Sequence, residues 1–411
     1  MRKKSMVTAI DVGTTKVATI IGEVNQDGDI RIVGVGITHS TGLHKGLVVN
    51  INEARESIHA SVKKAEQASG YKVESAYIGV TGRHVTSVNN RGVVAITRGD
   101  RLVRSDDLKR VLSCAQNIKV PTERKLLHII PRTYAIDGQA GIKNPVGMHG
   151  FRLDVEAHII TAAVTSVQNL IKCVRSIGLE IDDLILEPLA SSEAVLTEDE
   201  KQVGVILADI GGGTTDIAVF KDGSIWHTAV LPVAGYQMTR DVAVGLGLPF
   251  EVAEQMKKRY GSVMPVYEAK IDDQGTISQD GHGISYQDLS DIIRARVEEI
   301  VRLTVLELPQ SDYETIVPAG LVLTGGSSNL AGIDILARDI IRLPVRVGVP
   351  INLPGINESL RDPAYATGVG LLLWGAKNAN NGTKAWQYGG LNSRWHRVVN
   401  QLATLFRRPN K

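Results

Sequence analysis

The 411-residue sequence is poor in cysteine and in aromatic residues. Its two cysteines, Cys114 and Cys173, lie far apart and outside any CxxC or histidine-rich stretch, which argues against a disulfide framework or a zinc site and favours buried free thiols. Aromatic residues make up 4% of the chain, beside 43% hydrophobic and 22% charged residues, and this balance is typical of a soluble α/β protein. An apolar run of about 18 residues is also missing, so we expect a cytosolic chain without a membrane-spanning helix.

Charge is nearly balanced over the whole chain but uneven at its C-terminus. The formal net charge is +2. Residues 393–411 contain no acid, and their basic residues are Arg394, Arg397, Arg407, Arg408 and Lys411. Because the positive charge gathers in a short tail and not along a broad stripe, we expect no specific binding of nucleic acid.

Two stretches, residues 7–23 and 205–221, repeat one pattern. In each, an apolar β-rich run ends in an aspartate, turns through glycine and threonine, and resumes as a second apolar run, which predicts a hairpin with a tip of small residues. Backbone N–H groups and hydroxyls at such a tip can bind phosphate, and the carboxylate can hold a metal ion. Two facing tips would bind a nucleoside triphosphate from both sides.

The tips carry the residue types that this chemistry requires. Asp11 and Asp209 end their strands where they can reach a phosphate-bound Mg²⁺, through water because Mg²⁺ sheds water reluctantly. Lys16 can supply a positive charge to the β- or γ-phosphate. The glycines that would let phosphate approach the backbone, and the threonines that would donate hydroxyl hydrogens, are Gly13, Gly211, Gly212, Gly213, Thr14, Thr15, Thr214 and Thr215.

Periodicity predicts a common architecture for the two halves. Each hairpin leads into a third strand and a helix, the first at about residues 52–69 and the second from about Gly235. Two stretches have no counterpart: residues 83–160, an inserted α+β subdomain with a helix near 106–117, and residues 248–318, a helical subdomain with a long amphipathic helix at 289–308. We expect the first lobe to comprise residues 1–82, 161–200 and 360–376, the second 201–247 and 319–359, and a flexible linker residues 377–392.

These motifs resemble those of the actin, Hsp70 and sugar-kinase ATPase superfamily. IDVGTTK and LADIGGGTTD resemble its two phosphate motifs, VLTGGSSNLAG resembles its adenosine motif, and residues 186–196 and 364–373 resemble its connecting helices. The resemblance implies an α/β, actin-like ATPase fold: two duplicated ribonuclease-H-like lobes with the inserted subdomain and a C-terminal amphipathic helix, and with ATP and Mg²⁺ between the lobes.

In the adenosine motif, Gly325 and Gly326 would let adenine and ribose lie against the backbone, and Ser327 and Ser328 could cap the next helix.

The resemblance also assigns three charged residues. Glu254 and Lys257 would contact ribose and adenine, although a solvated helix face is the alternative. Glu187 stands where relatives carry a water-orienting side chain and is the candidate general base, with a buried capping carboxylate as its alternative.

The tail at residues 393–411 predicts an amphipathic helix. On a helical wheel, its basic residues Arg394, Arg397, Arg407 and Arg408 fall outside an apolar arc of about 120° that holds Trp395, Val398, Val399, Leu402, Leu405 and Phe406. At about 1.5 Å per residue the helix would be about 21 Å long, too short to cross ~30 Å of hydrocarbon. We expect it to lie on an anionic membrane surface; docking on the protein's own core is the alternative.

The position of the insert, between AYIGVTG and AHIITAA, resembles the FtsA family of bacterial cell-division proteins, as do GLHKGLVVNI and LASSEAVLTEDE. The resemblance implies a peripheral protein at the division site, on the cytoplasmic face of the cell membrane, that anchors the FtsZ ring, polymerises into actin-like filaments and recruits later divisome proteins. The FtsZ C-terminal tail would bind the helical subdomain. Whether ATP hydrolysis is slow or absent stays open, and a pilus-assembly actin-like adaptor ATPase is the alternative.

Overall fold

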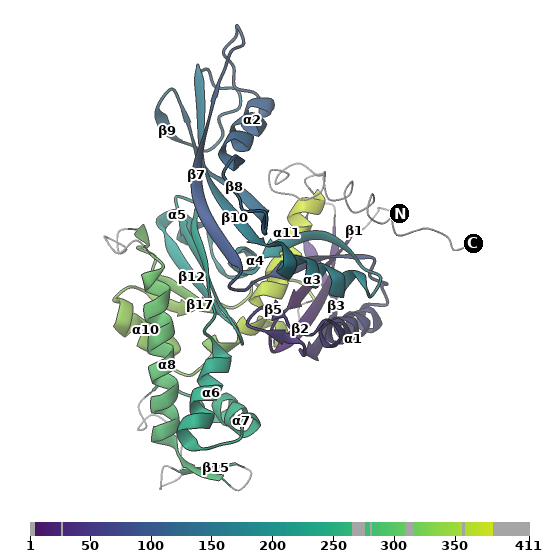
Figure 1. Cartoon of the computed structure of the whole chain (residues 1–411), viewed down its shortest axis with the longest axis vertical. Coiled ribbons are helices and arrows are strands. Elements are labelled where there is room, and N and C mark those ends of the chain that lie inside the picture. Colours follow the sequence, from purple (N-terminus) through teal and green to yellow (C-terminus); the bar gives the residue numbers. More distant parts are fainter. Residues whose placement is uncertain are drawn as a thin grey trace, which may run out of the picture.

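Two five-stranded sheets form the centres of two lobes in the computed structural model, which describes residues 5–25, 28–264, 276–279, 282–308, 316–355 and 358–380. The insert extends from one end of the molecule and the helical subdomain from the opposite end (Figure 1). The predicted amphipathic helix at 393–411 lies outside the described residues. Within them, no helix combines the length and apolar character needed to span a bilayer.

The sheet of the first lobe has the strand order β11-β6-β1-β2-β3. The hairpin partners β1 and β2 are antiparallel, and β6 runs parallel to both β1 and β11. Both strands of the hairpin are buried along most of their length, so helices cover both faces of the sheet. The bounds of the strands are β1 Ser5–Val12, β2 Lys16–Val24, β3 Ile30–His39, β6 Ser75–Val80 and β11 Glu180–Leu186.

The sheet of the second lobe repeats this topology, with the order β14-β13-β12-β17-β18. A hairpin, β12 and β13, is flanked by the antiparallel β14 on one side and by the parallel strands β17 and β18 on the other. The predicted duplication is therefore confirmed strand by strand. The bounds are β12 Val205–Ile210, β13 Thr215–Lys221, β14 Ser224–Leu231, β17 Leu321–Thr324 and β18 Val345–Val347.

Helix α1 (Ile51–Ser69) shows how local sequence sets the element ends. The Asn50 side chain accepts the N–H groups of Asn52 and Glu53 at its start, and Gly70, with φ of 68°, ends it in the left-handed conformation that glycine adopts most readily. The remaining helices of the first lobe and its connections are α3 Val164–Arg175, α4 Glu187–Val195, α5 Glu198–Val203, η3 Glu358–Arg361, η4 Pro363–Tyr365 and α11 Ala366–Asn380. Because α11 continues to Asn380, the first four residues of the predicted linker are helical, and Lys377 among them pairs with Glu193 of α4.

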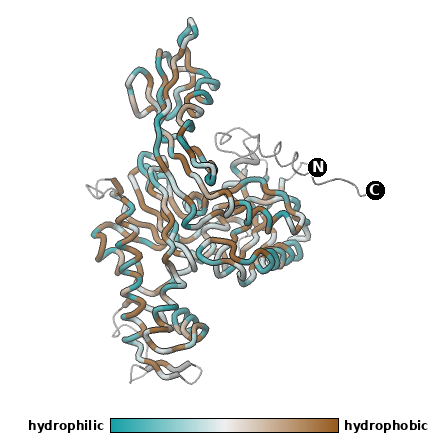
Figure 2. The backbone as a smooth tube through the Cα atoms, viewed as in Figure 1, coloured by the Kyte–Doolittle hydropathy of each residue, from teal (hydrophilic) through white to brown (hydrophobic). Residues whose placement is uncertain are grey.

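In the second lobe, one helix begins at Gly235, as predicted. The long amphipathic helix begins three residues earlier than expected. The bounds are α6 Gly235–Leu246, α7 Phe250–Tyr260, α8 Tyr286–Leu306, η2 Gly326–Asn329 and α10 Ile333–Ile341, with a small hairpin of β15 Thr276–Gln279 and β16 His282–Ser285. In Figure 2 the strands of both large sheets are largely brown, in keeping with their burial.

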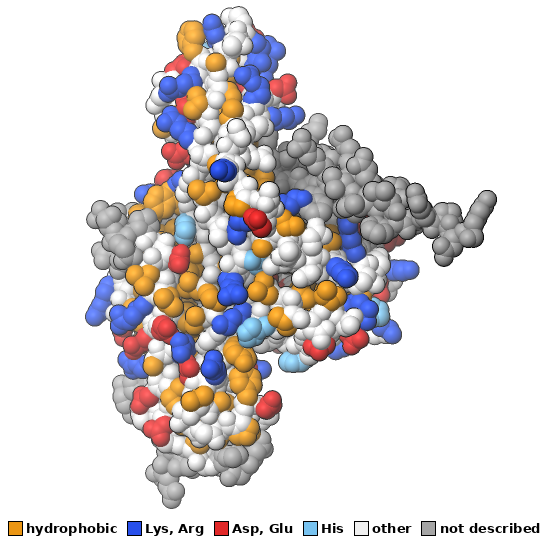
Figure 3. Space-filling view, viewed as in Figure 1, with side chains coloured by type: hydrophobic (Ala, Val, Ile, Leu, Met, Phe, Trp, Pro, Cys, Tyr) orange, Lys and Arg blue, Asp and Glu red, His pale blue; other side chains and the backbone are white. Residues whose placement is uncertain are grey.

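The insert is an α+β unit, as predicted, with its own hydrophobic core. Its sheet has the order β7-β10-β8-β9, and α2 (Ser105–Gln116) packs on β7 and β10. The bounds of its strands are β7 Val85–Ala95, β8 Arg124–Ile136, β9 Gln139–Ile142 and β10 Arg152–Ala163. On the face shown in Figure 3, acidic and basic side chains are interspersed over the insert and both lobes.

The insert also contacts the second lobe. Its strands β7 and β8 pack against the edge strand β14, forming what we term the insert–β14 seam. Ser87 Oγ donates to the Thr228 carbonyl oxygen at 2.9 Å, and Asn89 Nδ2 to the Trp226 carbonyl oxygen at 3.1 Å. The His158 ring hydrogen-bonds both Asn89 Oδ1, at 2.7 Å, and Thr228 Oγ1, at 2.9 Å. A unit that interrupts the chain of one lobe is thus hydrogen-bonded to the other.

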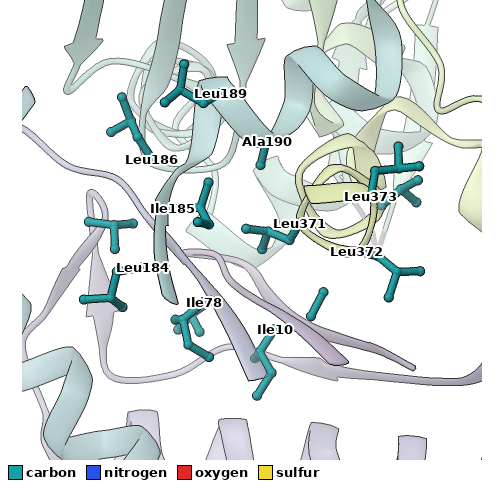
Figure 4. Packing of buried hydrophobic residues seen from close by; sticks show 14 of the residues in the cluster. Ile10, Ile78, Leu184, Ile185, Leu186, Leu189, Ala190, Leu371, Leu372 and Leu373 are labelled. Atoms are coloured by element: carbon teal, nitrogen blue, oxygen red, sulfur yellow. The ribbon is translucent and has the colours of Figure 1, made fainter. Parts of the chain in front are cut away.

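The two connecting helices, α4 and α11, cross at very short range in the largest core. A β-carbon added at Gly370 of α11 would lie 1.8 Å from the Ala190 carbonyl oxygen of α4. Figure 4 shows Ile10 and Ile78 of the sheet, Ala190 and Leu371 within this one core. Glycine at position 370 is therefore what permits the helices to touch backbone to backbone.

Candidate functional site

The two glycine–threonine tips lie against each other. The first loop (residues 13–15) joins β1 to β2, and the second loop (residues 211–214) joins β12 to β13. A β-carbon added at Gly212 would lie 2.4 Å from Thr15 Cγ2, and one at Gly213 would lie 2.5 Å from Thr14 Oγ1. The structure thus brings together the two loops that the sequence pairs only by their similarity.

A third segment, missed by sequence reasoning, closes over these loops. It is the short hairpin of β4 (Leu43–His44) and β5 (Leu47–Val48), whose turn residues Lys45 and Gly46 have φ of 49° and 72°. Positive φ at both positions is the signature of a type I′ turn, and the glycine at its second central position was the signal in the sequence. The Gly46 N–H donates to Thr14 Oγ1 at 3.4 Å, so the turn lies beside the first loop.

Asp11 and Asp209 are both buried at this junction. Burial raises the pKa of Asp11 to about 6, with Lys16 acting to lower it and Asp209 to raise it. Burial also raises the pKa of Asp209, although Ser191 Oγ, at 2.5 Å, and Thr367 Oγ1, at 3.0 Å, donate to its carboxylate and act in the opposite direction. These two donors come from the connecting helices α4 and α11, so the helices hold the second aspartate in place.

Asp216 is a third buried carboxylate, which the sequence analysis missed. It lies on β13, accepts a hydrogen bond from Thr214 Oγ1 at 2.8 Å, and accepts another from Thr81 Oγ1 of the first lobe. Burial, followed by the charge of Asp209, raises its pKa to about 7. The Asp216–Thr81 hydrogen bond therefore joins the two lobes directly beside the loops.

Glu187, the candidate general base, is the first residue of α4 and is 8% exposed. Burial raises the pKa of its carboxyl well above the usual value, and the neighbouring charge of Asp11 raises it further. Its Oε1 atom is buried without a hydrogen-bond partner among the described residues. This carboxyl therefore favours its protonated form until a positive charge arrives nearby.

The carboxylates fit a divalent cation only in part. Among the described residues, no group of three or more His, Cys, Asp or Glu side chains is arranged to hold a metal ion. Mg²⁺ commonly takes one or two carboxylates and completes its six ligands with water and phosphate oxygens. Asp11 and Asp209, both buried at the junction of the loops, could supply these one or two carboxylate ligands.

Two predicted phosphate ligands have other partners in the structure. Lys16 Nζ donates to the Ala364 carbonyl oxygen and lies 4.6 Å from the centre of the Tyr365 ring. Thr215 Oγ1 donates to the Val233 carbonyl oxygen at 2.7 Å, because its position on β13 directs the side chain away from the loop. The prediction that Thr215 presents a hydroxyl hydrogen at the tip is therefore wrong for this structure.

The glycine pair after β17 lies beside the second loop. Gly325 has φ of 84°, and a β-carbon there would lie 2.3 Å from Asp209 Oδ1. Ser327 Oγ donates to the Gly211 carbonyl oxygen at 2.9 Å, and Ser328 Oγ to the Thr324 carbonyl oxygen at 2.5 Å. The prediction that these serines cap the next helix is therefore wrong, because both hydroxyls donate to carbonyl oxygens of earlier residues. The residue at the start of α10 is Gly332.

Glu254 and Lys257 of α7 form an ion pair with an N···O distance of 2.7 Å. Burial acts to raise the pKa of Glu254, but Lys257, Thr239 and Lys258 together outweigh it, so that this pKa is lowered. Burial lowers the pKa of Lys257, although Glu254 acts in the opposite direction. The Lys257 side chain is 11% exposed, which contradicts the alternative of a solvated helix face.

Gly235, at the start of α6, is where these parts meet. A β-carbon there would lie 2.7 Å from Ser327 Oγ, 3.2 Å from the Gly211 carbonyl oxygen and 3.5 Å from Lys257 Nζ. The second loop, the glycine pair and the Glu254–Lys257 pair thus border one site.

The fold has known counterparts. A structure of the PilM–PilN type IV pilus biogenesis complex aligns with 90% of this chain and 98% of its own at a TM-score of 0.66 and 17% identity. MreB5 of Spiroplasma citri bound to ADP aligns with 92% of this chain and 99% of its own at a TM-score of 0.55 and 14% identity. At these identities the similarity establishes the actin-like fold, and the sequence-based fold class is confirmed for the two lobes and the insert; the C-terminal amphipathic helix stays a prediction.

Sequence comparison is more specific. The family model described as Cell division protein FtsA matches residues 206–370, and the one described as SHS2 domain inserted in FTSA matches residues 82–161. Cell division protein FtsA of Pseudomonas aeruginosa is 45% identical over 92% of this chain and 91% of its own, and that of Escherichia coli is 36% identical over 92% of each. These matches extend from lobe to lobe through the insert, and the chain belongs to the FtsA family of cell division proteins.

Proposed function

We propose that this protein acts in bacterial cell division as an actin-like ATP-binding protein, with Mg·ATP held between its two lobes. The observation that carries the proposal is the direct apposition of the first and second loops beside buried Asp11 and Asp209. The loop N–H groups would bind the phosphates, and the two aspartates would hold Mg²⁺ through water. Adenine and ribose would lie along Gly325, Gly326 and the Glu254–Lys257 pair. Structures of MreB5, which share the fold, are of that protein bound to ADP and to AMPPNP.

ATP would act mainly as a conformational ligand. A ligand that binds residues of both lobes favours the closed arrangement by its differential affinity for it. Glu187 would orient the attacking water, but burial raises its pKa and favours the protonated carboxyl, which cannot accept a proton from that water. Hydrolysis would therefore be slow or absent.

At the cell membrane, the protein would link the FtsZ ring to the cytoplasmic face. The amphipathic tail at 393–411 would bind anionic lipid, the FtsZ C-terminal tail would bind the helical subdomain, and the insert would serve self-association and the recruitment of later divisome proteins. A single short helix binds weakly, whereas a filament presenting many of them binds tightly, so polymerisation would switch on attachment.

Electron microscopy of the full chain on an anionic lipid monolayer, with and without ATP, tests this proposal. We expect membrane-bound protofilaments with ATP, and their loss on deleting residues 393–411. The matched control replaces Arg394, Arg397, Arg407 and Arg408 by lysine, which keeps the charge and should keep binding. Membrane binding that survives the deletion would contradict the anchor and favour a pilus-type adaptor, with which the chain shares the fold at 17% identity.

A further inference from the structure

A small cavity lies behind the two loops, between the β4–β5 hairpin, the end of β6, α3 and the start of α4. It offers about 20 Å³ of space for the centres of water molecules. Aliphatic and polar residues both line it, and the polar side chains are Thr81, His84, Ser166 and Glu187. A volume above about 10–15 Å³ on this measure holds at least one water, whereas an organic ligand would not fit.

Two side chains bring unsatisfied polar atoms to this cavity. Glu187 Oε1, His84 Nδ1 and His84 Nε2 are all buried without a hydrogen-bond partner among the described residues. Gly79 and Gly82 make room for them: a β-carbon at Gly79 would lie 3.2 Å from Glu187 Oε1, and one at Gly82 would lie 2.8 Å from His84 Nδ1. Buried polar atoms of this kind are normally paired, and three beside one water-sized cavity point to a bound water.

We propose that this cavity binds an internal water that bridges His84 and Glu187, and that His84 is thereby a positioning residue for Glu187. A water molecule donates two hydrogen bonds and accepts two, and a neutral imidazole offers one donor and one acceptor. Burial, and then the nearby Arg124 guanidinium, lower the pKa of His84 to about 4, so the ring is neutral near pH 7 and can serve both ways.

The insert reaches Glu187 from a second side. His128 Nε2 of β8 accepts the Leu186 N–H at 3.0 Å, one residue before Glu187. His84 directly precedes β7, the first strand of the insert. His84 and His128 both belong to the strands of the insert or directly precede them, so the water would complete a link between the insert and the Glu187 carboxyl. The relevance of that link to hydrolysis rests on the proposed function, whereas the water does not require a nucleotide.

A crystal structure of the full chain at a resolution that shows buried waters tests the proposal directly. We expect density within hydrogen-bond distance of both Glu187 Oε1 and a His84 ring nitrogen. A dry cavity in a map that shows other buried waters would overturn it. ATP binding, measured separately on the same protein, tests the proposed function; its failure would leave the expectation for this density unchanged.

The positioning role is tested by following the Glu187 carboxyl in ¹³C-glutamate-labelled protein by NMR, with Glu187→Gln assigning its signal. His84→Phe removes the bridge and should raise the pKa of Glu187 further, because a donor to its ionised form is lost. His84→Gln keeps a polar group, so the pKa of Glu187 should rise less in it than in His84→Phe. His59 is exposed, and His59→Phe should leave the pKa of Glu187 unchanged. If His84→Phe fails to fold, His84→Gln against His84→Leu makes the same comparison. An unchanged titration in the apolar variant would overturn the positioning role.

Discussion

Replacing Gly370 by alanine should separate the connecting helices. The added β-carbon would lie 1.8 Å from the Ala190 carbonyl oxygen and 2.3 Å from its carbon, both backbone atoms that no rotamer change can move. Since ordinary C···O contacts begin near ~3.3 Å, the helices must part by about 1.5 Å. Overpacking costs about 1–3 kcal/mol, and this backbone clash belongs at the upper end, whereas alanine returns up to about 1 kcal/mol of helix propensity. We expect a net loss of about 2 kcal/mol.

Gly368→Ala is the matched control on the same helix. Its β-carbon would meet the Ile20 Cδ1 atom at 3.1 Å, the far end of a flexible side chain, so this variant should be neutral or slightly stabilised. Urea unfolding followed by circular dichroism compares the two variants with the parent. Because Ser191 and Thr367, which donate to Asp209, flank the crossing, Gly370→Ala should also weaken ATP binding. If both alanine variants unfold at the same urea concentration, the close crossing does not exist in solution.

Three further outcomes follow from the site. The pKa of Asp216 is about 7 in the fold and near 3.8 when unfolded, so its contribution to stability is full below about pH 4 and is lost as the pH rises through 7. At about 1.36 kcal/mol per pKa unit this contribution amounts to about 4 kcal/mol. Asp216→Asn should remove it from the pH dependence of urea unfolding, and an unaltered pH dependence would exclude Asp216 as its source. Lys257→Gln should lower ATP affinity about tenfold in a fluorescence titration, because Glu254 loses its main partner. Lys258, which is exposed and paired with the same carboxylate, provides the control, and Lys258→Gln should change ATP affinity little. Equal effects of the two variants would contradict the role of Lys257. Gly212→Ala should hold the loops apart through its 2.4 Å contact with Thr15 and reduce ATP affinity about tenfold or more. Gly99→Ala, in the insert and with no atom within 4 Å of the added β-carbon, serves as control, and unaltered affinity in Gly212→Ala would refute closure at this point.

Much of the fold is legible in local sequence. Apolar β-rich runs separated by glycine–threonine tips predict the hairpins. Helix α1 is bounded by Asn50 and Gly70, residues suited to the two helix ends. The duplication made the pairing of the two loops predictable, because one motif repeated at equivalent places in two halves implies equivalent positions in two sheets.

The unpredicted parts of the site depend on contacts between distant segments. Thr81 and Asp216 are 135 positions apart, and Thr367 and Asp209 are 158 apart, so only the packing of the lobes unites them. Short polar side chains also leave no periodic signal of their own. Thr215 looked like a loop residue because it follows Thr214. On a strand, however, adjacent side chains face opposite ways, so the Thr215 hydroxyl donates to the Val233 carbonyl oxygen and not toward the loop.

The insert–β14 seam has a mechanical consequence. The insert leaves and rejoins the chain of the first lobe at residues 82–161, yet Ser87, Asn89 and His158 fasten it to the second. If one lobe swivels against the other, the insert cannot accompany both. Either the fastening slips, or the strands twist where they emerge and the outer end of the insert swings through an arc. As long as the hydrogen bonds of the insert–β14 seam hold, a hinge motion between the lobes is therefore transmitted outward along the insert, far from where it begins.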